Sequence, residues 1–208
     1  MYSLLRQPDA YSSVHFPMIF EWQLELHVPQ PHRDYAESFY RQHGVTDDTQ
    51  LLGLVPSASE PTRCWPASRF AALADTLNKS HGLVPVCFGS HTDQAIIDQV
   101  TSSAKTKILV EDFNRGNILD SAALIARCRV VVGNVSGPLH IADALGVPVV
   151  GIYGPHPPGR FGLLGARTRT VNMKLDCIPC NNPECVDRRC INDITVDMVN
   201  QAVLDLLK

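Results

Sequence analysis

The chain of 208 residues is 45% hydrophobic and 19% charged, proportions that are typical of globular domains and argue against disorder. Its formal net charge of -3 provides no broad cationic field, which excludes nucleic acid as an expected partner. It contains no apolar run of about 18 residues and no signal-peptide pattern at the N-terminus, so we expect a cytoplasmic protein without a transmembrane segment.

Residues 1–50 mix aromatic, histidine and proline residues without a sustained period, apart from Tyr35, Ala36, Phe39 and Tyr40. We predict a partial N-terminal segment or linker here, followed by one domain over residues 51–208. The aromatic side chains of this segment would either pack on the neighbouring domain or belong to an interface whose other side is missing.

From about residue 50 onward, short β-branched runs alternate with segments of helical period, which predicts βαβ units and a parallel sheet. The expected strands are 51–55, 84–88, 107–110, 130–132 and 149–153. Apolar stripes at helical spacing lie between them, as in Phe70, Leu73, Ala74 and Leu77. We expect a surface loop over 154–169, which is rich in Pro, Gly and Arg, and a last helix after Thr195. The pattern predicts a doubly wound, Rossmann-like α/β fold.

Two strand-to-helix connections contain residues that suit phosphate binding. In loop B (residues 133–140), Gly137 permits close backbone approach and Ser136 can donate to an oxygen, while the helix start offers free N–H groups. In loop A (residues 56–66), Ser59 and Arg63 can bind phosphate oxygens. Ligands bind at the carboxyl ends of parallel strands, so both loops should emerge at one sheet edge. The alternatives are a plain Ser-capped helix and a solvated Arg63, and we interpret Trp65 as a core anchor.

The order and spacing of these motifs resemble the heptosyltransferases of glycosyltransferase family 9. That family typically reads Pro-Gly-Ala-Ser, Lys, Trp-Pro, then Gly-Asn-Asp-Ser-Gly-Pro-Met-His, Ala-Leu-Gly-x-Pro and Tyr-Gly-Pro. The corresponding segments here are Pro56-Ser57-Ala58-Ser59, Arg63, Trp65-Pro66, Asn134 to His140, Ala144 to Pro148 and Tyr153-Gly154-Pro155. The sequence departs from the family pattern at Val135 for Asp, Ser57 for Gly and Arg63 for Lys.

The resemblance covers roughly residues 50–208 and implies the C-terminal, donor-binding domain of a two-domain GT-B glycosyltransferase. By carry-over, Ser59 and Arg63 would contact the diphosphate of an ADP-heptose-like donor, Ser136 and Gly137 would bind it at the helix start, and His140 would line the same site. The implied acceptor is lipopolysaccharide core or, as in some relatives, a protein, and the place of action includes the inner face of the inner membrane.

The chemistry implied by the resemblance is only half represented in this sequence. The sequence has no Asp-x-Asp element to hold a metal, so we expect transfer to require no cofactor, with the loop B helix and Arg63 stabilising the leaving diphosphate. The family's general base is an Asp in a first domain, to which nothing here corresponds, and such a domain takes on the order of 150 residues. We therefore expect a donor-binding half that transfers nothing alone. The alternatives are a silent nucleotide-sugar-binding module that acts through a partner, and a metal-finger interaction domain.

The metal-finger alternative rests on the cysteine segment (residues 177–190), which contains Cys177, Cys180, Cys185 and Cys190. The spacing C-x2-C-x4-C-x4-C would allow four thiolates to surround one tetrahedral zinc or iron ion. Some family relatives that modify proteins look similar in having a cysteine-bound iron finger. The alternative is a set of reduced structural cysteines or adventitious disulfides.

Overall fold

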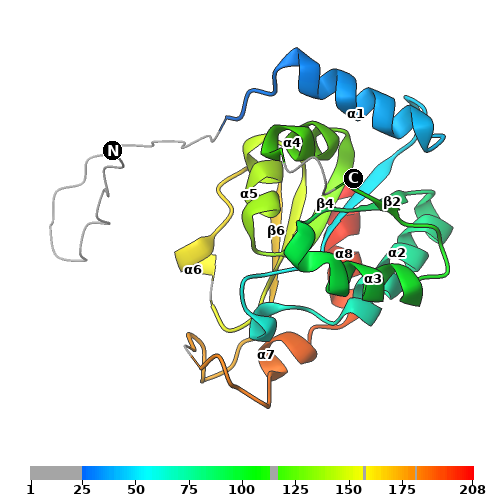
Figure 1. Cartoon of the computed structure of the whole chain (residues 1–208). Helices are drawn as coiled ribbons and strands as arrows, with labels where there is room; N and C mark the ends of the chain where they lie inside the picture. The colour runs from blue at the N-terminus through cyan, green and yellow to red at the C-terminus, as the bar shows by residue number, and fades with distance from the viewer. Residues whose placement is uncertain (1–24, 113–116, 157, 181) are drawn as a thin grey trace, which may run out of the picture.

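The computed structural model describes residues 25–112, 117–156, 158–180 and 182–208, and its centre is a six-stranded parallel sheet (Figure 1). The strand order is β3-β2-β1-β4-β5-β6. The bounds are β1 Leu51–Val55, β2 Val84–Cys87, β3 Leu109–Val110, β4 Cys128–Asn134, β5 Val149–Tyr153 and β6 Thr168–Asn172. Because the chain order reverses direction between β1 and β4, the loops that leave these two strands meet at a topological switch point.

Helices cover both faces of the sheet, as expected for a doubly wound fold (Figure 1). Helices α2, α3 and α8 pack on one face, and α1, α4 and α5 pack on the other. The helix bounds are α1 Gln30–Gln42, α2 Ala67–His81, α3 Gln94–Ser103, α4 Ile118–Ala126, α5 Gly137–Ala144, α6 Pro158–Phe161, α7 Arg189–Asn192 and α8 Val196–Leu207, with 3-10 turns η1 Pro61–Arg63 and η2 His91–Asp93.

The strands are buried on both sides, so their side chains alternate between two cores. In β1, Leu52 and Leu54 belong to the core under α2, α3 and α8, whereas Leu51 and Val55 belong to the core under α1, α4 and α5. This double burial accounts for the continuous apolar runs that predicted the strands. No helix in the described ranges is long and apolar enough to cross a membrane.

Several element boundaries differ from the sequence expectations. β1 and β5 have the expected bounds, β4 extends two residues beyond 130–132 at each end, and β3 is limited to two residues. The expected loop over 154–169 contains the short helix α6, and its last two residues begin β6. β6 was missed because it is an edge strand in which only Val171 is buried, so its pairing with β5 leaves no hydrophobic pattern.

The described part of the N-terminal segment packs on the domain that follows it. Phe39 and Tyr40 of α1 are buried, and the Tyr40 hydroxyl donates to the carbonyl of Leu124 in α4 at 2.8 Å. The backbone N–H of Leu26 donates to the carbonyl of Ala144 at 3.2 Å. For Phe39 and Tyr40, the first of the two alternatives therefore holds; the aromatic residues before residue 25 lie outside the described residues. The division of the chain at residue 50 stays a prediction.

Candidate functional site

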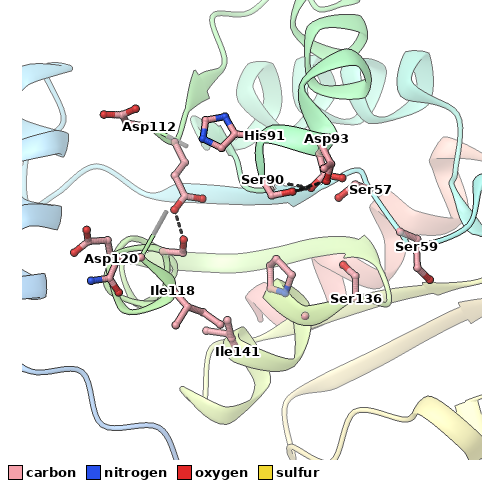
Figure 2. Close-up of a pocket in the computed structure, with 18 residues that line it drawn as sticks. Ser57, Ser59, Ser90, His91, Asp93, Asp112, Ile118, Asp120, Ser136 and Ile141 are labelled. Atoms are coloured by element: carbon pink, nitrogen blue, oxygen red, sulfur yellow. Dashed lines mark hydrogen bonds between the residues drawn. The ribbon is translucent and has the colours of Figure 1, made fainter. Parts of the chain in front are cut away.

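Loops A and B converge on one cavity of about 590 Å³ at the carboxyl edge of the sheet. Ser57 and Ser59 reach it from the end of β1, and Ser136 and Gly137 reach it from the end of β4 (Figure 2). The expectation that both loops emerge at the same edge is confirmed. We call this space the main cavity.

A buried amide joins the two loops. Asn134, at the last position of β4, is fully buried; its Oδ1 accepts from the backbone N–H of Trp65 at 3.0 Å, and its Nδ2 donates to the carbonyl of Pro56 at 2.7 Å. Trp65 is itself buried, and its indole N–H donates to the carbonyl of Ile194 at 2.8 Å, which confirms its interpretation as a core anchor. Asn134 thus sets the spacing between loops A and B.

Loop B presents the start of α5 to the main cavity without a side-chain cap. Ser136 occupies the N-cap position, but its hydroxyl donates to the carbonyl of Asn134 at 3.2 Å instead of capping the helix. Gly137 is exposed, and a side-chain carbon added there would have no neighbour within 4 Å. Ser136 therefore does not cap the helix through its side chain, and the binding of a ligand at this helix start stays a prediction.

Arg63 lies between the loops instead of in the main cavity. Its guanidinium donates to Ser59 Oγ at 3.1 Å and to the carbonyl of Val135 at 3.2 Å, so it is not simply a solvated charge. It faces a separate small crevice with Tyr153 and His156. Val135, which replaces the family's Asp, is buried in the core under α1, α4 and α5.

His140 is half-buried one turn into α5 and does not belong to the described residues that line the main cavity. Its backbone N–H donates to the carbonyl of Ser136 at 3.2 Å, as a helical residue should. The structure therefore brings Ser59, Ser136 and Gly137 together around the cavity, but it does not bring His140 into it. The ligand contacts assigned to these residues stay predictions.

The opposite end of the main cavity is acidic, which sequence reasoning missed. Glu111 and Asp112 follow β3 and Asp120 lies in α4; all three line the cavity (Figure 2 labels the two aspartates). His32 of α1 contacts Asp120 through Nδ1 and Oδ1 at 2.7 Å. The signal in the sequence was the pair of acidic residues directly after an apolar strand.

Glu111 is the most buried ionisable group at this end apart from Asp120. Glu111 is 7% exposed, and burial raises the pKa of its carboxyl group to about 6. The Ser121 hydroxyl donates to its Oε1, and hydrogen bonds from Ser121 and from the backbone of Gly89 offset part of the rise in its pKa. Between the two ends, Ser90 and Asp93 form a capping box that closes the cavity wall (Figure 2).

The four cysteines of the cysteine segment line a second, much smaller cavity of about 30 Å³. All four are free thiols, and burial together with the neighbouring thiols raises the pKa of Cys190. Within the described ranges, no three potential ligands have the arrangement of a metal site. The segment is tied to loop A through Arg188, which donates to the carbonyls of Pro61 at 2.6 Å and Cys64 at 3.0 Å.

Comparison with known proteins assigns a family to this arrangement. Residues 10–190 match the family model described as Glycosyltransferase family 9 (heptosyltransferase). The chain belongs to this family. A lipooligosaccharide heptosyltransferase 2 of Haemophilus ducreyi is 32% identical over 178 residues, which cover 81% of this chain and 51% of that protein.

Solved structures of family 9 have the same fold. The E. coli ADP-heptose lps heptosyltransferase II is 26% identical with a TM-score of 0.72, and the glycosyl transferase family 9 protein from Veillonella parvula is 28% identical with a TM-score of 0.76. In both cases the match covers 88% of this chain and 53% of the other. The chain spans about half the length of the curated family 9 relatives it matches.

Proposed function

We propose that this chain is the donor-binding half of a heptosyltransferase that transfers a sugar from an ADP-heptose-type donor to a lipopolysaccharide core. The observation that carries the proposal is the convergence of loops A and B on the main cavity, with the uncapped start of α5 facing it. Backbone N–H groups and the helix dipole at such a start favour a diphosphate. The relatives are named as heptosyltransferases that use ADP-heptose and act on lipooligosaccharide or lipopolysaccharide, and we take the proposed sugar and acceptor from them.

We assign the contacts with the diphosphate to residues of both loops. The α5 start at Gly137 and the hydroxyls of Ser57 and Ser59 donate to the phosphate oxygens. Arg63 places a permanent positive charge beside Ser59, where it stabilises the negative charge that develops on the departing diphosphate. In this arrangement, protein groups stabilise the leaving group.

Transfer also needs a base for the acceptor hydroxyl, which we assign to a separate N-terminal domain. Among the described residues that line the main cavity, the carboxylates are Asp93 on its wall and Glu111, Asp112 and Asp120 at its acidic end. The coverage of about half of each relative agrees with a division into donor and acceptor halves. We place the reaction at the cytoplasmic face of the inner membrane, where a lipid-linked acceptor would be presented.

Isothermal titration calorimetry with ADP tests the donor site. Gly137→Val fills open space at the α5 start, so we expect the variant to fold normally and to bind ADP at least 10-fold more weakly. Gly159→Val is the matched control, because Gly159 in α6 is equally unobstructed and lies outside the main cavity. The absence of ADP binding by the wild type, or equal binding by Gly137→Val, would overturn the proposal.

A turnover assay separates the half-enzyme from a complete one. With ADP-heptose and a deacylated core acceptor, we expect no product from this chain alone. Clear product formation would show that the catalytic base lies within it. A catalytically silent module remains the outcome if ADP binds but no acceptor domain restores transfer.

We propose, second, that the cysteine segment holds a structural zinc or iron ion. The supporting observation is that all four thiols line one small cavity, and thiolates are the ligands that such ions prefer. Elemental analysis of tag-free protein should find near-stoichiometric zinc or iron, which Cys180→Ser should reduce. A metal-free wild type would reject the site, and unchanged ADP binding by Cys180→Ser would make the segment peripheral to the donor.

A further inference from the structure

The cysteine segment contacts two of the loops at the carboxyl edge of the sheet. Arg188 donates to the carbonyls of Pro61 and Cys64 in loop A, at 2.6 and 3.0 Å. The backbone N–H of Cys180 donates to the carbonyl of Pro155, in the loop after β5, at 2.9 Å. These hydrogen bonds join residues that are far apart in the chain, so the segment supports the same edge of the sheet at which the main cavity lies.

The two carbonyls that Arg188 binds lie at the two ends of the turn η1. Pro61 begins this turn, and Cys64 directly follows its last residue, Arg63. Both hydrogen bonds use the same side-chain nitrogen, Nη2, so one group holds both ends of the turn. Thr62, in the middle of the turn, is buried and lines the small cavity of the cysteine segment. The position of Arg63 therefore depends on a group that lies outside loop A.

The backbone of Arg188 adopts a conformation that its surroundings must enforce. Its φ of 48° lies in the left-handed region, and among the described residues no other residue except glycine has a positive φ. This conformation is unfavourable for a residue with a β-carbon and persists where neighbouring contacts determine it. The Arg188 carbonyl accepts from the N–H groups of Ile191 and Asn192 in α7, at 3.0 and 2.8 Å. Ile191 is fully buried, so α7 fixes the Arg188 backbone to the core.

Arg63 connects the η1 turn to both loops of the proposed donor site. Its guanidinium donates to Ser59 Oγ in loop A and to the carbonyl of Val135 in loop B. Ser59 in turn lines the main cavity. A shift of the turn would lengthen these hydrogen bonds and would move the charge of Arg63 relative to a bound diphosphate, which changes their electrostatic attraction.

We propose that Arg188 is a positioning residue of the donor site, which holds the η1 turn so that Arg63 stays between loops A and B. This inference rests on the proposed function, because it takes loops A and B as the diphosphate site. Arg188 does not belong to the described residues that line the main cavity, and it acts through Arg63. The cysteine segment thereby contributes to donor binding without contacting the donor.

The test is a double-mutant cycle on the full chain, with ADP binding measured by calorimetry at pH 7.5. We expect Arg63→Met to weaken ADP binding about 10-fold and Arg188→Met to weaken it about 5-fold. Because Arg188 acts through Arg63, the double variant should bind ADP no more weakly than Arg63→Met alone. Independent effects would instead multiply to about 50-fold.

Arg69→Met is the matched control for the loss of structural hydrogen bonds. Arg69 is also half-buried, and one of its nitrogens donates to two backbone carbonyls, those of Asn192 and Ile194, outside the main cavity. Urea unfolding should show that Arg69→Met and Arg188→Met both lower the free energy of unfolding, whereas only Arg188→Met should weaken ADP binding. Arg188→Lys is a milder second variant, which keeps the charge and one nitrogen donor and should bind ADP more tightly than Arg188→Met.

Four results would overturn the inference alone. They are effects of Arg63→Met and Arg188→Met that multiply in the double variant, equal ADP affinity of Arg188→Met and wild type, equal weakening of ADP binding by Arg69→Met, and equal ADP affinity of Arg188→Lys and Arg188→Met. A wild type that does not bind ADP would overturn the proposed function and this inference with it.

Discussion

Replacing Asn134 by Ala should destabilise the protein and loosen the donor site together. The side chain is fully buried and makes two hydrogen bonds, one to the N–H of Trp65 and one to the carbonyl of Pro56. Its removal leaves two backbone groups without partners in the core between loops A and B. A buried unsatisfied group costs about 1 to 3 kcal/mol, so the two together cost roughly 2 to 6 kcal/mol.

The expected loss is large enough to measure and small enough to leave a folded protein. Domains of this size unfold with a free energy of about 5 to 15 kcal/mol, and a loss of about 3 kcal/mol, within the expected range, lowers Tm by about 6 to 12 °C. Urea unfolding followed by circular dichroism at pH 7.5 gives the free energy of unfolding. Calorimetry with ADP on the same samples should show at least 10-fold weaker binding, because Asn134 sets the spacing of the two loops.

Asn78→Ala is the matched control for this experiment. Its amide donates a single hydrogen bond to the carbonyl of Leu83 at 3.0 Å, at the end of α2 and outside the main cavity. We expect a loss of about 1 kcal/mol and unchanged ADP affinity. The reasoning is refuted if Asn134→Ala costs no more than Asn78→Ala, or if it leaves ADP binding unchanged.

Three further predictions concern the same region. Burial raises the pKa of Glu111 from 4.5 to about 6, so between these pH values the folded state keeps a proton that the unfolded state has lost, and the stability of the wild type falls as pH rises. Urea unfolding should therefore show that the stability of Glu111→Gln relative to wild type increases by about 2 kcal/mol from pH 4 to 8. A difference that does not change with pH would contradict this prediction. In Gly133→Ala the new carbon would lie 2.6 Å from the carbonyl oxygen of Val55, which would force β1 and β4 apart. We expect the free energy of unfolding to fall by about 1 to 3 kcal/mol. A variant with the same Tm as the wild type in thermal unfolding would contradict this. Arg188→Met removes two hydrogen bonds to loop A and should weaken ADP binding in calorimetry, whereas Arg189→Met, on an exposed side chain, should not; equal effects would rule out a positioning role for Arg188.

Local patterns predicted most of the fold, because strands that are buried on both faces appear in the sequence as continuous apolar runs. β1 and β5 are continuous apolar runs, and α2 buries the Phe70, Leu73 and Leu77 stripe that its spacing indicated. β6 exposes most of its side chains and has no such apolar run. Its existence depends on hydrogen bonds to β5, which no local pattern records.

Some residues of the candidate site could likewise be predicted from local patterns, and others could not. Ser59, Ser136 and Gly137 were predicted because strand-to-helix connections carry recognisable residue types, and parallel strands bring such connections to one edge. His140 was placed in the site by resemblance, but the α5 helix holds it outside the described lining of the main cavity. The role of Asn134 and the burial of Glu111 depend on residues that are distant in the sequence, which no local pattern records.

The amino-acid sequence by itself determined the α/β class, the parallel strands and the two loops, because burial and backbone conformation act over a few neighbouring residues. Only the tertiary structure decided that Arg63 bridges the loops, that Asn134 connects them through hydrogen bonds, and that the buried carboxyl group of Glu111 lines the same cavity as the α5 start. These features arise from contacts between strands that are adjacent in the sheet and distant in the chain. Hydrogen-bond satisfaction is a property of the packed molecule, and the spacing of residues along the chain does not contain it.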